Sequence, residues 1–238
     1  MKKKFFLGVM AATMLLLVSG CRTLVNGKLE SSKITIEKDK VKELDLELNV
    51  GAGELEVNKG TDDWVEGTIE YNHDKLKPEV SYKLKGDKGI GIIEQGNKLN
   101  NIKIGNIKNN WKLNLNNEIP IDLSVNTGAS QTKLDLKGLN LSGLDVKAGV
   151  GDITIDLGGK WKKGFDATLE IGVGKSTIIL PKDVGVKIDS SKGIGNTEFV
   201  DFISKGNGVY VNEAYEKADV IINLNTEMGI GETIFKLQ

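Results

Sequence analysis

The 238-residue sequence is poor in the side chains that most enzymes use for catalysis. Histidine occurs once, as His73, arginine once, as Arg22, and cysteine once, as Cys21. A single histidine removes multi-histidine zinc sites and most histidine-based catalysis. Without arginine beyond residue 22, the chain also lacks the best bidentate ligand for phosphates and carboxylates. We therefore expect no catalytic residues, no metal site, no cofactor and no enzyme activity.

Proline and aromatic residues are also scarce, whereas glycine is abundant. The chain has 3 prolines and 29 glycines, and 5% of its residues are aromatic. Frequent glycine between stretches of alternating Val, Ile and Leu, with almost no long helical periodicity, predicts short strands joined by tight turns. The 32 basic and 33 acidic residues are evenly spread. No basic stripe of the kind expected for nucleic-acid binding is present.

The N-terminus has the pattern of an export signal. Lys2, Lys3 and Lys4 precede an apolar run from Phe5 to Val18 that is too short to span a membrane as a helix. The sequence Val18-Ser19-Gly20-Cys21 resembles the lipobox of bacterial lipoproteins, which implies diacylation of Cys21 and cleavage after Gly20. We expect a lipoprotein anchored to a membrane of the cell envelope through Cys21. No thiol would then remain for a disulfide.

One unit recurs along the chain: an alternating apolar strand, a Gly-x-Gly turn, and a second alternating strand. The turn glycines are Gly51, Gly53, Gly128, Gly149, Gly151, Gly172, Gly174, Gly193, Gly195, Gly229 and Gly231. The first glycines at 128, 149, 172 and 193 are 21, 23 and 21 residues apart, and the step to Gly229 is 36. We predict an all-β, single-stranded β-solenoid with coils of about 21 residues, and an insertion at about 200–219.

The repeats align into columns. One column, predicted to face inward, is Val57, Leu134, Ile155, Ile178, Phe199 and Phe235. The residue between the two turn positions is always apolar: Ala52, Ala129, Val150, Val173, Ile194 or Ile230. We expect these six residues to point into the core at a corner, with the glycines supplying unusual φ values and a close backbone approach. The chain stops just after the last repeat, so we expect that end of the solenoid to be uncovered.

The order of several motifs resembles the toast-rack domain proteins of the bacterial envelope. These motifs are Leu48-Asn-Val-Gly-Ala-Gly-Glu-Leu-Glu-Val57, Val65-Glu-Gly-Thr-Ile-Glu-Tyr-Asn72, Lys77-Pro-Glu-Val-Ser-Tyr82 and Ile92-Ile-Glu-Gln95. The part from Asn110-Trp-Lys-Leu-Asn-Leu115 onward is similar to the extracytoplasmic domain of Lia-type envelope-stress proteins. The resemblance covers residues 41–238 and implies a β-solenoid outside a membrane, with no known activity or ligand.

The predicted organisation has four parts. They are a signal peptide (1–20), a tether and lead-in (21–40), an N-terminal toast-rack-like β module (41–110) continuous with the rest, and a solenoid repeat region (111–238).

Three features suggest alternative functions. Gly172-Val-Gly-Lys-Ser176 superficially resembles a phosphate-binding loop but lacks its spacing and following helix, so no nucleotide is expected. The outward charged residues are interpreted as a solvated face, with calcium or an acidic active-site row as the alternative. Tyr210 and Tyr215, in the insertion, are weak candidates for an exposed aromatic binding pair.

The predicted function is non-enzymatic. The chain would present a β-solenoid surface for binding, scaffolding or self-association, with a link to the envelope-stress response resting on the resemblance alone. Its partners would be the membrane and an envelope protein, a glycan or the protein itself. The alternative is a carbohydrate-active enzyme or a glycan-binding adhesin on a β-helix, with Asp135, Asp152 or Asp156 as carboxylates.

Overall fold

The structure is a computed structural model that describes residues 28–96, 107–191 and 193–238. The predicted signal peptide (1–20) and Cys21 lie outside the described residues. Nearly all regular structure is β, in one 15-stranded sheet that folds back on itself, so the predicted all-β class is confirmed. No helix in the described part is long and apolar enough to cross a membrane.

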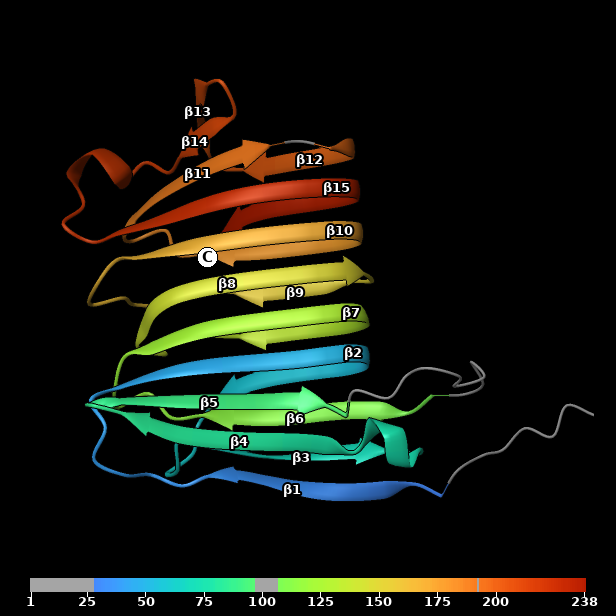
Figure 1. Ribbon diagram of the computed structural model, residues 1–238. Coiled ribbons are helices and arrows are strands. Elements are labelled where there is room, and N and C mark those ends of the chain that lie inside the picture. Colours follow the sequence, from blue (N-terminus) through green and yellow to red (C-terminus); the bar gives the residue numbers. More distant parts are fainter. Residues whose placement is uncertain (1–27, 97–106, 192) are drawn as a thin grey trace, which may run out of the picture.

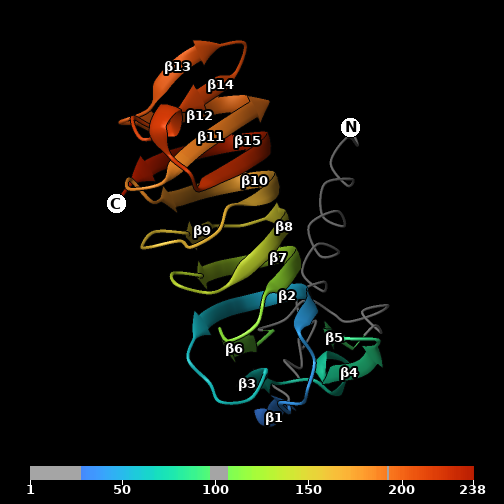
Figure 2. The ribbon, with the colours of Figure 1, turned by 90° about the vertical axis from the view of Figure 1, so that its left-hand side faces the viewer.

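Bent strands stacked in parallel form the body of the molecule (Figure 1). They are β2 (Glu43–Lys59), β7 (Ile121–Asp135), β8 (Leu141–Val150) with β9 (Ile153–Asp156), β10 (Phe165–Leu180), β11 (Gly185–Ser191) with β12 (Ile194–Val200), and β15 (Ile221–Leu237). Each runs along one layer, turns at its glycines and returns along the other layer. The result is a β-helix-like stack of two facing layers (Figure 2).

The alternation of apolar and polar residues explains the two layers. In a strand, successive side chains point to opposite faces, and β2 alternates between buried and partly exposed positions on both sides of its bend. The inward residues of neighbouring strands stack in register, because Val57 pairs with Leu134 and Leu134 with Ile155. The predicted apolar column is therefore confirmed, with Phe199 at its end only half-buried.

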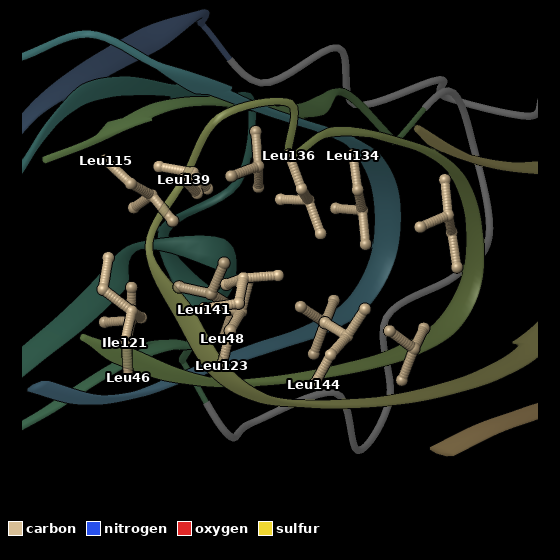
Figure 3. Close-up of a cluster of buried hydrophobic side chains, with 14 of the residues drawn as sticks. Leu46, Leu48, Leu115, Ile121, Leu123, Leu134, Leu136, Leu139, Leu141 and Leu144 are labelled. Atoms are coloured by element: carbon tan, nitrogen blue, oxygen red, sulfur yellow. The ribbon is translucent and has the colours of Figure 1, made fainter. Parts of the chain in front are cut away.

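The hydrophobic core fills the space between the two layers. Leucines such as Leu46, Leu123 and Leu144 point into it from one layer and meet Leu134 and Leu136 from the other (Figure 3). All five are at most 3% exposed. Burying one such side chain contributes roughly 2 kcal/mol, so packing along the stack is the main source of stability in a fold that uses no disulfide.

The order of the strands in space differs from their order in the chain. The spatial order is β2, β7, β8 with β9, β10, β15, and then β11 with β12. The last repeat, β15, thus lies between β10 and β11 and pairs in parallel with both. The expectation that the last repeat forms an uncovered end was wrong, because the insertion lets the chain pass β11 and return to an inner position.

The N-terminal end carries the same kind of inversion. Two later strands, β5 (Lys88–Gln95) and β6 (Asn109–Leu115), pair in parallel with the two halves of β2 on its outer side. Antiparallel strands then close this end: β4 (Pro78–Lys85) on β5, β3 (Val65–Tyr71) on β6, and β1 (Glu30–Ile36) on β3. A short 3-10 helix, η1 (Asp74–Leu76), links β3 to β4.

These contacts bear on the predicted parts of the chain. Residues 30–36 of the expected tether and lead-in (21–40) form β1 and belong to the sheet. β2, from the N-terminal module, pairs along its length with β7, from the repeat region. One core therefore runs through both, and the division near residue 110 stays a prediction.

The insertion forms the C-terminal cap. It contains β13 (Ile203–Gly206), β14 (Val209–Val211) and the 3-10 helix η2 (Tyr215–Lys217). β14 pairs antiparallel with β11, and β13 pairs with β14. The other half of this end stays open, because β12 pairs only with β15 among the described strands.

Candidate interaction surface

The second turn glycine allows each strand to bend against its neighbour. Gly174 has a φ of +145°, which side chains other than glycine rarely adopt. A Cβ placed there would lie 1.9 Å from the carbonyl oxygen of Gly151 in the adjacent strand. Both the dihedral angle and the close approach therefore require glycine at this position.

The first turn glycine is required for a different reason. Gly128 has no positive φ, but a Cβ there would lie 2.2 Å from the carbonyl oxygen of Gly51. The predicted close approach thus applies to both glycines, whereas the unusual φ belongs to the second. At Ser130, which replaces the second glycine in β7, the hydroxyl instead turns inward to Thr132 Oγ1 at 2.9 Å.

The residue between the glycines points outward, contrary to the prediction. The two layers converge at the bend, and Ile171 and Ser176 already fill its inner side in β10. No room is left inside for Val173, so the strand alternation breaks and the four residues from Gly172 to Lys175 all lie outside the core. The corner is convex, and its apolar side chain lies on the outside.

These outward residues form a continuous ladder, which we call the bend ridge. In spatial order it consists of Ala52, Ala129, Val150, Val173, Ile230 and Ile194, and each pairs with the next. Val150 is 57% exposed, Val173 43%, Ile230 54% and Ile194 74%. The ridge follows the bends along one side of the stack (Figure 1). Contiguous exposed apolar surface is typical of interaction sites, so the bend ridge is the candidate interaction surface.

A groove of about 750 Å³ runs beside the bend ridge, on the side of the first turn glycines. Gly51, Gly128, Gly149, Gly172 and Gly229 contribute to it. Two buried polar atoms in its lining, Gln95 Nε2 and Thr127 Oγ1, have no hydrogen-bond partner among the described residues. Because both atoms are buried, a ligand in the groove could reach them only after a side chain moved.

Two rows of polar side chains flank the ridge. The row on the groove side is Asn49, Asn126, Lys147, Glu170, Glu227 and Ser191, and the other is Glu54, Gln131, Asp152, Lys175, Glu232 and Asn196. Within the chain, Lys147 pairs with Glu170 at 3.1 Å and Lys175 with Glu232 at 3.2 Å. All four side chains are largely exposed, so these pairs add little stability.

The two tyrosines singled out from the sequence lie in different elements of the C-terminal cap, Tyr210 in β14 and Tyr215 in η2. Tyr210 is half-buried and stacks on Phe199 with ring centroids 3.6 Å apart, and Phe199 stacks in turn on Phe235 at 4.8 Å. This geometry gives Tyr210 a packing role in the cap. Tyr215 is partly exposed on η2. A binding role for either tyrosine remains a prediction, as does lipidation of Cys21.

The carboxylates considered for glycoside hydrolysis are tied up in ion pairs or turns. Asp135 and Asp156 are cross-strand neighbours, and Lys137 Nζ lies 3.4 Å from one and 3.1 Å from the other. Asp152 Oδ1 accepts a hydrogen bond from the Lys175 amide. Within the described residues, no group of three histidine, cysteine or acidic side chains is arranged to hold a metal ion. The geometry thus favours a structural role for these carboxylates.

Sequence reasoning missed the buried asparagines that connect the layers. Asn109 is fully buried and donates to the Ala52 carbonyl at 2.6 Å and to Gln95 Oε1 at 2.8 Å. At the other end, Asn212 Oδ1 accepts from the Val186 amide and its Nδ2 donates to the Val184 carbonyl. Both stand in polar stretches that look like linkers, and only their tertiary partners distinguish them.

Comparison with known proteins identifies the family. The model of the N-terminal domain of toast_rack matches residues 25–179, and the model described as cell wall-active antibiotics response LiaF, C-terminal, matches residues 127–233. No curated protein matches. The predicted resemblance to toast-rack proteins with a Lia-type C-terminal region is confirmed.

The chain is also similar to solved structures. A candidate cell adhesion protein from Clostridium sporogenes is 32% identical with a TM-score of 0.83, over 89% of this chain and 100% of that chain. A candidate adhesin from Bacteroides fragilis is 14% identical with a TM-score of 0.32, over 88% of this chain and 97% of that chain. Because the first family model spans residues 25–179, well over half of the sequence, the chain belongs to the toast_rack family.

Proposed function

We propose that this protein is a non-enzymatic, lipid-anchored protein of the bacterial cell envelope that uses the side of a β-solenoid as a binding surface. The observation that carries the proposal is the bend ridge, because four exposed branched aliphatic residues in one line are not expected on a surface that contacts only solvent. The family, the LiaF-like match and the candidate cell adhesion protein support a place in the envelope.

The predicted anchor suits presentation of this surface. β1 begins at Glu30, nine residues after Cys21, so the N-terminal end of the stack would lie next to the membrane. Eleven strands follow one another from β1 to β13. Ten steps of ~4.8 Å give a height of roughly 48 Å, and the ridge would extend along the side of this column, away from the lipid surface.

The anchor is tested by labelling cells with a radioactive fatty acid. The full chain should incorporate the label and sediment with membranes, and Cys21→Ser should lose both properties while keeping its fold. A chain that carries label with serine at position 21, or that sediments unchanged, would rule out this anchor.

The binding surface is tested by photo-crosslinking in intact cells. A photoreactive residue at Val173 samples the bend ridge, and one at Lys133 serves as the control, because that side chain is 64% exposed on the second half of β7, away from the ridge. We expect the Val173 probe to capture an envelope component or a second copy, and the Lys133 probe not to. Equal capture at both positions, or none at Val173, would contradict the proposal.

A further inference from the structure

The side chains of the bend ridge increase in size along the stack. In spatial order they read alanine, alanine, valine, valine, isoleucine, isoleucine, from Ala52 to Ile194. The five steps span about 24 Å at the usual strand spacing. The inner position of β15 does not alter the gradation, because both Ile230 and Ile194 are isoleucine.

We propose that the bend ridge is the interface of an antiparallel dimer of this chain, with a twofold axis between Val150 and Val173. The inference rests on the proposed function and specifies its partner as a second copy. A twofold interface must be self-complementary, so the proposal can be checked against both the shape and the charge of the surface.

The bend ridge is complementary in shape to the bend ridge of a second copy that runs in the opposite direction. About the proposed axis, Ala52 faces Ile194 of the second copy, Ala129 faces Ile230, and Val150 faces Val173. Small residues meet large ones at both ends, and two medium ones meet at the centre. The combined side-chain volume is thus nearly constant along the contact, as close packing without voids requires.

The flanking rows are complementary in charge about the same axis. On the groove side, Lys147 faces Glu170 of the second copy. On the other side, Asp152 faces Lys175 of the second copy. By symmetry each attraction occurs twice, giving four opposite-charge contacts around the apolar centre.

The remaining flanking residues bring no two like charges together. Asn126 faces Glu227, Asn49 faces Ser191, Gln131 faces Glu232 and Glu54 faces Asn196. Every one of these pairings places at most one charge against a neutral polar group. Complementarity of this kind fixes the register and orientation of an interface.

A parallel dimer would be less favourable, although it would also have four opposite-charge contacts, Lys147 with Asp152 and Glu170 with Lys175, each made twice. The difference lies in the fit of the ridges and in one like-charge contact. It would place each rung against the same rung of the second copy, so that isoleucine meets isoleucine at one end and alanine faces alanine across a gap at the other. It would also bring Glu232 against Glu227. The antiparallel arrangement is therefore the one that the surface favours.

The contact is narrow, which predicts a weak dimer. Stable interfaces bury about 800 Å² on each partner, and a single ridge with two flanking rows lies at the low end of that scale. Many anchored copies on facing surfaces would compensate through multivalency. Because antiparallel partners have their N-terminal ends at opposite ends of the contact, the dimer would join chains on two facing membranes.

Thiol crosslinking tests the arrangement. The full chain carrying Cys21→Ser has no other cysteine, so Ala129→Cys and Ile230→Cys each supply a single thiol. In the proposed dimer the thiols of two Ala129→Cys chains lie about 14 Å apart, too far for a disulfide, whereas one of each kind lie opposite each other. We expect disulfide-linked dimers in the mixture and none with either variant alone.

Two results of this experiment would overturn the proposal. Disulfide formation by each variant alone would indicate a parallel dimer, and no disulfide in the mixture would show that the ridges do not meet. If the Val173 photoprobe still captures an envelope component in that case, the proposed function stands and the dimer alone is wrong. If the mixture forms no disulfide and the Val173 photoprobe captures nothing, both the dimer and the proposed function are wrong.

A charge reversal gives an independent test. Lys147→Glu and Glu170→Lys should each weaken self-association about tenfold or more in sedimentation velocity at high concentration, because each creates two like-charge contacts. An equimolar mixture should restore association, since the heterodimer regains both attractions. A change within the chain cannot be rescued by mixing, so failure of the mixture to associate would also overturn the proposal.

Discussion

The two ends of the stack solve the same topological problem with different chemistry. At each end, strands that are out of sequence order form the outermost parallel coil: β5 and β6 lie outside β2, and β11 and β12 lie outside β15. Antiparallel strands then cap this coil. Both caps pack on the apolar core and each has a buried asparagine, but they differ in a further contact. In the N-terminal cap, Asp39 accepts hydrogen bonds from Trp64 Nε1 at 3.0 Å and the Tyr82 hydroxyl at 2.8 Å. In the C-terminal cap, the rings of Tyr210, Phe199 and Phe235 stack.

This difference explains where the molecule is closed and where it is open. Polar contacts tie both layers of the N-terminal end together, and the outer strand β4 carries Glu79, Lys83 and Lys85, which protect a sheet edge. The aromatic contacts close only the half of the C-terminal end that lies under β14. β12 keeps a free outer edge among the described strands, and Ile194 on it is the most exposed residue of the bend ridge.

The largest expected effect comes from Phe235→Ala, which removes the buried ring of the aromatic stack. Phe235 is fully buried, and truncating such a residue costs about 3–5 kcal/mol of the free energy of unfolding. Hydrogen exchange should show the loss of protection first in β12 and β14. The N-terminal strands β3 and β6 should stay protected, because their contacts are untouched.

Phe235→Leu is the matched control. It keeps most of the buried volume and should cost under about 1.5 kcal/mol. Equal loss of protection at β3 and β14 in Phe235→Ala would mean that the stack unfolds as one unit and that its two ends are not independent.

The next effect comes from the buried asparagines, one at each end. Asn212→Ala leaves the Val186 amide and the Val184 carbonyl without a partner, and Asn109→Ala does the same to the Ala52 carbonyl. Each unsatisfied buried group costs about 1–3 kcal/mol. Urea titration should therefore show losses of about 2–3 kcal/mol, with Asn212→Ala affecting β11 and Asn109→Ala affecting β2.

Exposed asparagines provide the control for this pair. Asn225→Ala changes a solvent-facing position of β15 and should lie within about 0.5 kcal/mol of the wild type. If Asn109→Ala and Asn212→Ala are as mild as Asn225→Ala, the buried hydrogen bonds do not hold the two ends.

Regular parts of the fold were predictable because they repeat. Alternation in β2 or β10 gives the layers, and the spacing of glycines such as Gly128 and Gly149 gives the register, because every coil obeys the same local rules. The order of β15 and β11 was not predictable in this way. Both segments match the repeat pattern equally well. Their order in space depends on the path of the insertion that connects them, which no local sequence pattern encodes.

The surface was mispredicted for a related reason. Val150 and Val173 are apolar and flanked by glycines, so alternation places them inside, but two converging backbones leave no volume there. Only the geometry of the bend decides this. The alignment of the repeats does show a column of apolar residues between the turn glycines. That column can be recognised as an exposed surface only once the inner side of the bend is known to be full.

A smaller effect is expected from pH, and only at the N-terminal end. Partial burial alone would raise the pKa of Asp39, but hydrogen bonds from Trp64, Tyr82 and the Val41 amide lower it below its ordinary value. The stabilisation by this carboxylate is therefore present at neutral pH and is lost as the pH falls through the lowered pKa. Asp39→Asn should flatten the acid limb of a stability profile, and β3 should show the change before β14.

The hydrogen bond between Tyr82 and Asp39 also makes stability depend on pH in the alkaline range. Burial and the hydrogen bond to Asp39 raise the pKa of Tyr82 to about 12. A raised pKa means that this stabilisation is complete below the ordinary value near 10 and is lost as the pH rises from there toward about 12. Tyr82→Phe should remove that limb, measured as the difference in unfolding free energy between pH 9 and pH 11.5. An unchanged limb would assign it to other groups.

The smallest effect is expected from the surface ion pair of the C-terminal cap. Lys205 Nζ lies 2.8 Å from Glu216 Oε1, and the two side chains are 45% and 65% exposed. Such pairs contribute about 0–1 kcal/mol, so Lys205→Ala should change the urea midpoint by less than the asparagine variants do. Added salt should reduce the difference further. A loss above about 1.5 kcal/mol would mean that charge, and not ring stacking alone, holds β13 to η2, and the chemical contrast between the two ends would weaken accordingly.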